Sequence, residues 1–159
     1  METIHSRPDL EQEKSTDHAE KDAALLEFMT EFRQSQSSME ELQHTMEKYP
    51  GLLSGEHYWR TISKNGQDFS AAAEVDELQS QVIAFSSISN ANEILCAINL
   101  HREEHIPVYV TLDDNLHPSG SKMYCLYASA NSPAELNVED RNGKAIRLTI
   151  PPRALVIYG

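Results

Sequence analysis

The chain is short of cysteine, glycine and basic side chains, and it contains no long apolar run. Without a stretch of about 18 apolar residues, no segment is suited to span a bilayer. The glycines Gly55, Gly66 and Gly120 stand alone and form no phosphate-binding loop. The 13 Lys and Arg face 25 Asp and Glu, for a net charge of −12, so no basic stripe is available to neutralise phosphates. The composition argues against nucleic acids and anionic membranes as partners.

The two cysteines, Cys96 and Cys125, each lie within an apolar strand pattern and not in a CxxC pair. This pattern is typical of buried, reduced thiols in a cytoplasmic protein, although a disulfide between them is compatible with it. Residues 1–8 lack the apolar segment of a signal peptide. We therefore expect a cytoplasmic location.

Length and charge divide the chain into unequal parts. Its 159 residues suffice for one domain with a hydrophobic core, but a (β/α)₈ barrel of roughly 200 residues or more does not fit beside another domain. Residues 1–50 hold 12 acidic and 5 basic side chains and are the more acidic part. Residues 1–16 are polar and have no apolar periodicity, so we expect a disordered acidic arm there.

Residues 17–50 predict two amphipathic helices that pack on the domain that follows. The first begins at a capping box formed by Asp17 and Glu20, and Pro50-Gly51 ends the second. A second capping box, Ser37 or Ser38 with Glu40 or Glu41, predicts where the second helix begins. The apolar face of the first helix holds Leu25, Phe28, Met29 and Phe32. The apolar face of the second helix holds Met39, Leu42, Met46 and Tyr49.

Residues 51–159 predict a mainly β domain, an antiparallel β-sandwich of the Greek-key type with seven to eight strands. The strongest turn signal is Asn142-Gly143, because both central residues of a type I′ turn adopt positive φ. Asn90-Ala91-Asn92 is another turn signal. The predicted strands are His57–Ser63, Val82–Ser89, Glu93–Leu100, Pro107–Asp113, Met123–Ser129, Leu136–Asp140, Lys144–Ile150 and Arg153–Tyr158.

Residues 38–159 resemble the last barrel helix and the C-terminal β-domain of α-amylase-family glycoside hydrolases. The match is a series of weak positions in the right order, and Ser87 stands where many relatives carry arginine. The resemblance implies that the catalytic barrel, with its nucleophile, acid/base and third carboxylate, is absent from this chain. We therefore expect a non-catalytic protein, not an enzyme. The similar segments are 39–52, 55–63, 82–88, 93–101 and the closing residues 142–159.

The residues themselves offer no catalytic or metal site. Glycoside hydrolysis needs two carboxyl groups about 5–9 Å apart across a cleft. The adjacent pairs Glu103-Glu104, Asp113-Asp114 and Glu139-Asp140 do not supply them, because neighbours on a strand point to opposite faces and turn residues are solvated. His101 and His105 flank one pair, but in a hairpin loop and not on a helix. We expect no metal and no cofactor.

The resemblance and the helices together lead to three hypotheses about function. The first is an accessory module that associates with a protein partner or with a second copy of itself, because removal of a barrel leaves the face of Met39, Leu42, Met46 and Tyr49 to be covered. The second is an α-glucan-binding module. The third is a truncated remnant of a glycoside hydrolase.

Tyr58 and Trp59 are the candidate carbohydrate-binding residues, because exposed aromatic rings stack on the apolar side of a pyranose. As neighbours on a strand they are expected to point to opposite faces. An exposed Trp59 would form a platform for a sugar. The alternative, a Trp59 buried between helix and sandwich, is the more common arrangement for such a residue.

Overall fold

The computed structural model describes residues 22–159, so the arm expected over residues 1–16 and the Asp17 capping box lie outside the described residues. Residues 22–34 are helical. The elements that follow are α2 (Gln36–Lys48), α3 (Gly51–Ser54), β1 (Glu56–Trp59), β2 (Ile62–Ser63), η1 (Ala72–Glu74), η2 (Gln79–Gln81), β3 (Val82–Ser89), β4 (Asn92–Asn99), β5 (Ile106–Leu112), β6 (Lys122–Ala128), β7 (Glu135–Asn137), β8 (Glu139–Asp140), β9 (Lys144–Ile150) and β10 (Leu155–Tyr158).

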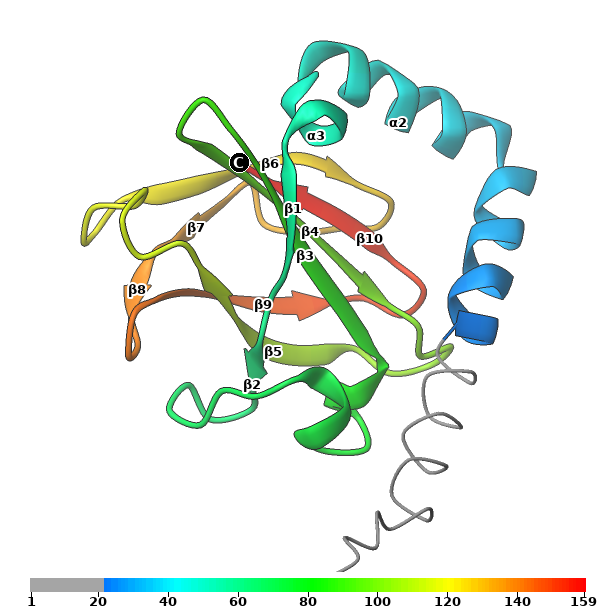
Figure 1. Ribbon diagram of the computed structural model, residues 1–159. Coiled ribbons are helices and arrows are strands. Elements are labelled where there is room, and N and C mark those ends of the chain that lie inside the picture. The colour runs from blue at the N-terminus through cyan, green and yellow to red at the C-terminus, as the bar shows by residue number, and fades with distance from the viewer. Residues whose placement is uncertain (1–21) are drawn as a thin grey trace, which may run out of the picture.

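The strands form two antiparallel sheets, which confirms the mainly β fold behind two helices (Figure 1). The larger sheet has the order β1-β3-β4-β10-β6-β7, and the smaller has the order β2-β5-β9-β8. Alternate residues of β5 and β9 are buried, as expected for a sheet with one face on the core. The last strand, β10, lies between β4 and β6, so the end of the described chain fills the middle of the larger sheet.

Ten strands replace the eight that the sequence predicts, because two predicted strands change sheets midway. The segment predicted over 57–63 divides into β1, which pairs with β3, and β2, which pairs with β5. The segment predicted over 136–140 divides into β7, which pairs with β6, and β8, which pairs with β9. Each break is a corner at which the chain passes from one sheet to the other.

The start of α2 differs from the predicted capping box. The helix begins at Gln36, with Ser35 as an N-cap whose side chain makes no capping hydrogen bond to the backbone. A single non-helical residue, Ser35, separates α2 from the helix before it, so no room remains for a box centred on Ser37 or Ser38.

Two tight turns adopt positive φ, as their sequences predict. Asn142 and Gly143, at φ of 53° and 117°, join β8 to β9. Asn90 and Ala91, at φ of 51° and 62°, are the two-residue loop between β3 and β4. Positive φ at both positions matches the right-handed twist of the strands, but it costs an alanine about 1 kcal/mol or more. Ala91 is therefore a strained residue in an otherwise favourable turn.

A buried ionic cluster holds the corner between β1 and β2 to the larger sheet. The Glu93 side chain is fully buried and lies 2.6 Å from the Arg60 guanidinium and 2.7 Å from His117 Nε2. The backbone N–H of Asp113 donates to the same carboxylate. Burial by itself raises the pKa of Glu93, but these donors, together with Ser86, outweigh it and lower the pKa to about 2.

The β3–β4 turn leads to a first prediction. Ala91→Gly should raise the free energy of unfolding by about 1 kcal/mol, because glycine adopts positive φ without strain. Urea denaturation of the full chain measures this change. The control is Gly143→Ala, which should destabilise, since an added Cβ would lie 2.5 Å from Asp114 Oδ1. A destabilised Ala91→Gly variant would contradict the assignment of strain.

The ionic cluster leads to a second prediction. A carboxylate with its pKa lowered from 4.5 to about 2 stabilises the fold above pH 4.5, and this contribution is lost as the pH falls toward 2. The difference in unfolding free energy between the unmodified chain and Glu93→Gln should be on the order of 3 kcal/mol near pH 7 and should shrink between pH 4.5 and 2. Glu135 forms an exposed ion pair with Lys122, so Glu135→Gln serves as the control and should lower the free energy of unfolding by less than about 1 kcal/mol. A difference that does not vary with pH would contradict the prediction.

Candidate functional site

The larger sheet is apolar on both faces. Every residue of β4 from Glu93 to Asn99 is buried, instead of the alternation expected for a strand with one solvated face. Leu95 and Ala97 point between the two sheets, while Cys96 and Ile98 belong to a separate cluster on the outer face. An apolar outer face of this extent has to be covered by something other than the second sheet.

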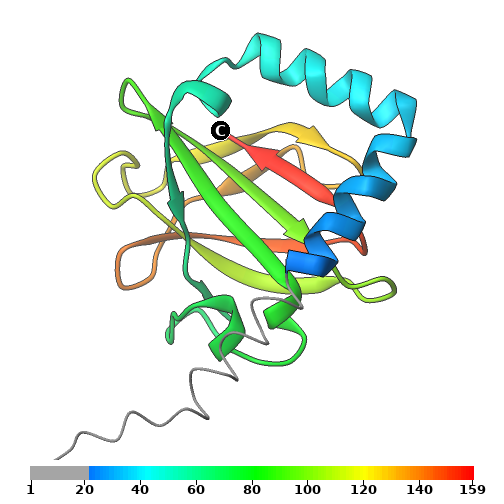
Figure 2. The same cartoon turned by 45° about the vertical axis from the view of Figure 1, so that its right-hand side comes forward.

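The helices supply this cover on three sides. Figure 2 shows the helix of residues 22–34 beside the sheet at the right, α2 along the top, and α3 at the upper left, where the chain enters the edge strand β1. Leu42, Met46 and Tyr49 of α2 and the buried Leu52 of α3 pack against the outer cluster. Ser87 Oγ donates to Gly51 O over 2.6 Å and so holds α3 against β3.

The helix of residues 22–34 is fixed to the sheet by its apolar side chains and by ion pairs. Phe28 is 5% exposed and stacks on Phe32, whose ring meets the edge of Tyr127 at 6.5 Å. On the other side of the helix, Glu27 and Glu31 both form ion pairs with two arginines of the sandwich loops. These arginines are Arg102 and Arg153.

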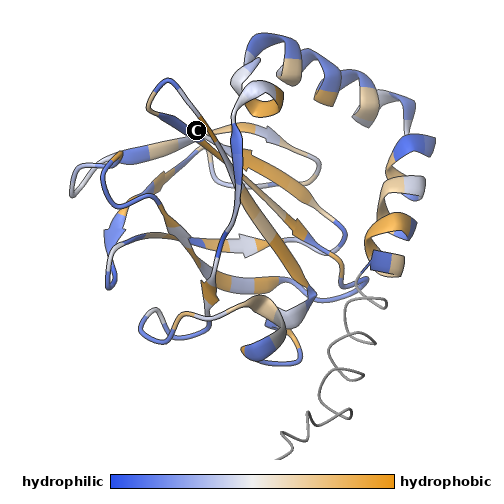
Figure 3. Cartoon of the chain, in the orientation of Figure 1, coloured by the Kyte–Doolittle hydropathy of each residue, from blue (hydrophilic) through white to orange (hydrophobic). Residues whose placement is uncertain are grey.

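Between these elements the outer face stays open as a groove of about 410 Å³, which we call the outer-face groove. Its lining residues come from the helix of residues 22–34, from α2, α3 and β1, and from the sheet beneath them. Phe85, Cys96 and Ile157 belong to the sheet, and Figure 3 shows how the apolar strands run beneath the helices. The side chains that line it from the helices and β1 include Met29, Met39, Met46, Leu53 and Trp59.

The outer-face groove is poor in polar groups. Three of its lining residues have an ionisable side chain: Arg33, His57 and Cys96. His57 Nε2 is already hydrogen-bonded to Leu52 O. Burial raises the pKa of Cys96 to about 12, so this thiol is neutral and belongs chemically to the apolar lining. Both cysteines are free thiols. The arrangement suits an apolar occupant and offers no acid/base pair.

The helix face proposed for a partner lies partly against its own sheet. Leu42, Met46 and Tyr49 pack on the outer cluster, so they are half-buried and not left open as a bare barrel-facing surface. Met39, Leu42 and Met46 also line the outer-face groove, whereas Tyr49 lines a different cleft. The sequence reasoning missed Met29, Leu53, His57 and Phe85 as lining residues. The 3.6-residue period marked Met29 as apolar but gave no sign that three helices meet here.

Tyr58 and Trp59 lie at the edge of the larger sheet and are both exposed. Trp59 is 78% exposed and meets Phe85 edge-on at 6.2 Å, so the expectation that it is buried between helix and sandwich is wrong. β1 pairs only with β3, and no element covers its outer edge within residues 22–159. Tyr58 is 42% exposed and donates its hydroxyl to Glu56 on the side that faces Arg60. Only Trp59 of the two lines the outer-face groove.

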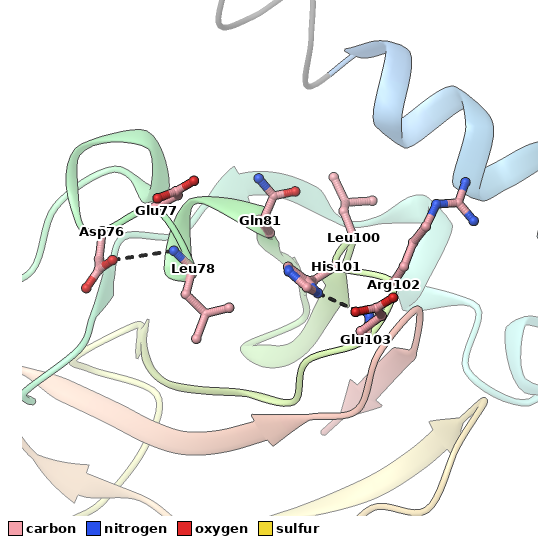
Figure 4. A pocket seen from close by; sticks show the side chains of 8 residues that line it. All are labelled: Asp76, Glu77, Leu78, Gln81, Leu100, His101, Arg102 and Glu103. Atoms are coloured by element: carbon pink, nitrogen blue, oxygen red, sulfur yellow. Dashed lines mark hydrogen bonds between the residues drawn. The ribbon is translucent and has the colours of Figure 1, made fainter.

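A second cleft, of about 650 Å³, lies at the β4–β5 loop beside η2 (Figure 4). Asp76, Glu77 and Glu103 line this cleft together with His101, and only Glu103 lies beside the imidazole. His101 Nδ1 accepts hydrogen bonds from the backbone N–H groups of Glu103 and Glu104. The buried Asn99 side chain fixes the same loop through Glu104 O and Ile150 O. Among residues 22–159 no three His, Cys, Asp or Glu side chains converge to hold a metal ion.

The other adjacent carboxylates are engaged in turns and ion pairs. Asp113 Oδ1 accepts from the backbone of Asn115, and Asp114 Oδ1 accepts from the backbone of Lys144. Asp140 forms an ion pair with Lys144. A third cleft, of about 730 Å³, is lined by Tyr49 and Tyr124 near the Glu93 cluster. Since the Glu93 carboxylate is already satisfied by three donors, it serves the fold there.

Comparison with known proteins shows a likeness of fold. No protein family matches the chain. No curated protein matches it. Two solved structures of a debranching enzyme from Nostoc punctiforme are 19% identical, and each comparison covers 77% of this chain and 20% of that enzyme, with TM-scores of 0.49 and 0.50. The match is thus of domain size, and the chain corresponds to a small part of the enzyme's length.

Proposed function

We propose that this protein is a non-catalytic module, related to α-amylase-family enzymes, that associates with a protein partner through the outer-face groove. The observation that carries the proposal is an open apolar groove of about 410 Å³ on a sheet face that its own helices leave partly uncovered. Contiguous exposed apolar surface of this kind is characteristic of interaction sites.

The family relation is supported by two likenesses, one of sequence pattern and one of fold. Residues 38–159 resemble the last barrel helix and the C-terminal β-domain of the family, and the fold likeness is to part of a debranching enzyme, itself an α-amylase-family protein. Fold alone does not assign an activity, so the non-catalytic role rests on Glu93, Asp113, Asp114 and Asp140, whose carboxylates are engaged in structural contacts.

Exposed apolar side chains support association at this face. Six large apolar residues are exposed among residues 22–159, and three of them, Met29, Leu53 and Trp59, line the outer-face groove. No helix in that part of the chain has the length and hydropathy to cross a membrane. The two free thiols fit a reducing compartment, and we propose the cytoplasm.

Site-specific photocrosslinking tests the association. Leu53 and Tyr124 are both exposed, but only Leu53 lines the outer-face groove. With p-benzoylphenylalanine at position 53, we expect one discrete crosslinked product that Met29→Lys abolishes. The same group at position 124 should not give that product. Identical products from both positions would contradict a role for the groove.

A second candidate function, α-glucan binding, is favoured by the exposure of Trp59. This ring is 78% exposed at a sheet edge, which leaves its face available for stacking on a sugar. The neighbouring Tyr58 is exposed as well, and its hydroxyl donates to Glu56.

Native affinity electrophoresis with glycogen or soluble starch in the gel tests this candidate. An α-glucan-binding role predicts retardation of the unmodified chain and about tenfold weaker retardation of Trp59→Ala. Tyr124→Ala, an exposed aromatic outside the groove, should behave like the unmodified chain. Unchanged mobility in glucan would exclude this function and leave the protein-association proposal in place.

A further inference from the structure

We propose that the segment that occupies the outer-face groove is an amphipathic α-helix with basic residues along its flanks, supplied by another protein. This inference rests on the proposed function and adds the chemistry of the partner. It follows from three properties of the groove: the lack of polar groups, the abundance of methionine, and the charge around it.

The lack of polar groups favours a helix over an extended segment. Apart from the cationic Arg33 and the engaged His57, the lining side chains are apolar or aromatic or belong to Cys96. An extended segment laid on them would bury backbone N–H and C=O groups without partners, each at a cost of about 1–3 kcal/mol. A helix satisfies its own backbone and presents apolar side chains at i, i+3, i+4 and i+7.

The methionines make the surface adaptable to such a helix. Met29, Met39 and Met46, three of the five methionines in the chain, line the outer-face groove. Their unbranched, polarizable side chains adjust to different apolar partners, which is why methionine is frequent at helix-binding surfaces. Phe85 and Trp59 add a rigid aromatic pair at one side.

The charge of the surrounding helices selects a basic partner. Glu40, Glu41 and Glu47 are exposed on α2, and none of them forms an ion pair within residues 22–159. Figure 3 shows polar colours on the side of α2 turned away from the sheet. Glu27 and Glu31 on the other helix are compensated by arginines. Lys48 is the one basic residue of α2, so this helix keeps a net negative charge, although Arg33 of the groove lining is itself basic. A second copy of this chain, itself at −12, would bring like charges together, whereas Lys and Arg flanks are attracted.

The test uses a synthetic Leu/Lys peptide of about 18 residues with leucines at helical spacing, long enough to form a helix once docked. Trp59 is the only tryptophan, so its fluorescence reports the outer-face groove directly. We expect a blue shift of the emission and saturable binding to the full chain. A peptide of the same composition in scrambled order, and a Leu/Glu peptide with helical spacing, should bind at least about tenfold more weakly.

Variants at exposed positions separate specific docking from general attraction without disturbing the fold. Leu53→Gln and Met29→Gln should each weaken binding of the Leu/Lys peptide about tenfold. Leu26 is 65% exposed but does not line the groove, so Leu26→Gln should leave peptide binding unchanged. Glu40→Gln with Glu47→Gln should weaken binding and reduce its salt dependence, whereas Glu74→Gln should not.

The outcomes distinguish this inference from the proposed function. Equal binding of the scrambled peptide, or groove variants that bind like the unmodified chain, would overturn the inference. Preference for the Leu/Glu peptide would overturn the charge assignment. Position 53 could instead crosslink only to a second copy of this chain, in a groove-dependent way and with a dimer seen by light scattering. This result would overturn the inference of a helix from another protein and would still support association through the groove. Crosslinks from position 53 that Met29→Lys leaves unchanged would refute the proposed function itself.

Discussion

The structure depends on one constraint, a six-stranded sheet that is apolar on both faces. β4 is buried from Glu93 to Asn99, and apolar area contributes about 25 cal/mol per Å² removed from water, so each face of the sheet needs a cover of its own. The four-stranded sheet packs on the inner face, together with residues such as Ala72, Val75 and Leu78 from the segment between β2 and β3. The outer face is left to short helical elements, which cover a flat sheet less completely than a second sheet does. The outer-face groove is what remains of that face.

The way in which the helices are attached follows from the unequal charge. Acidic residues outnumber basic ones almost two to one, and several arginines are used inside the fold. Arg60 neutralises buried Glu93, and Arg102 and Arg153 hold Glu27 and Glu31 of the first helix. The carboxylates of α2 are left without such partners among the described residues. The same distribution of charge that fixes one helix therefore leaves α2 with a net negative charge.

The second helix buries part of its apolar face against its own chain. Leu42, Met46 and Tyr49 pack on the outer cluster of the sandwich. Because amphipathic pattern specifies only that a face is buried, such a helix can exchange one apolar partner for another. Met39 lines the groove without joining the outer cluster, so this part of the helix face is left open to the groove.

The sequence by itself determined the fold class, the strands from Val82 to Ser89 and from Lys144 to Ile150, and the turn at Asn142-Gly143, because these depend on period-two alternation and on local φ preferences. It also marked both helices as amphipathic. Only the tertiary structure decided which surfaces meet: the corners that divide two strands, the Glu93–Arg60 contact across 33 positions, and the exposure of Trp59. Periodicity tells which side of an element is apolar, but the surface that covers that side is set by long-range packing, and so the groove could not be read from the sequence.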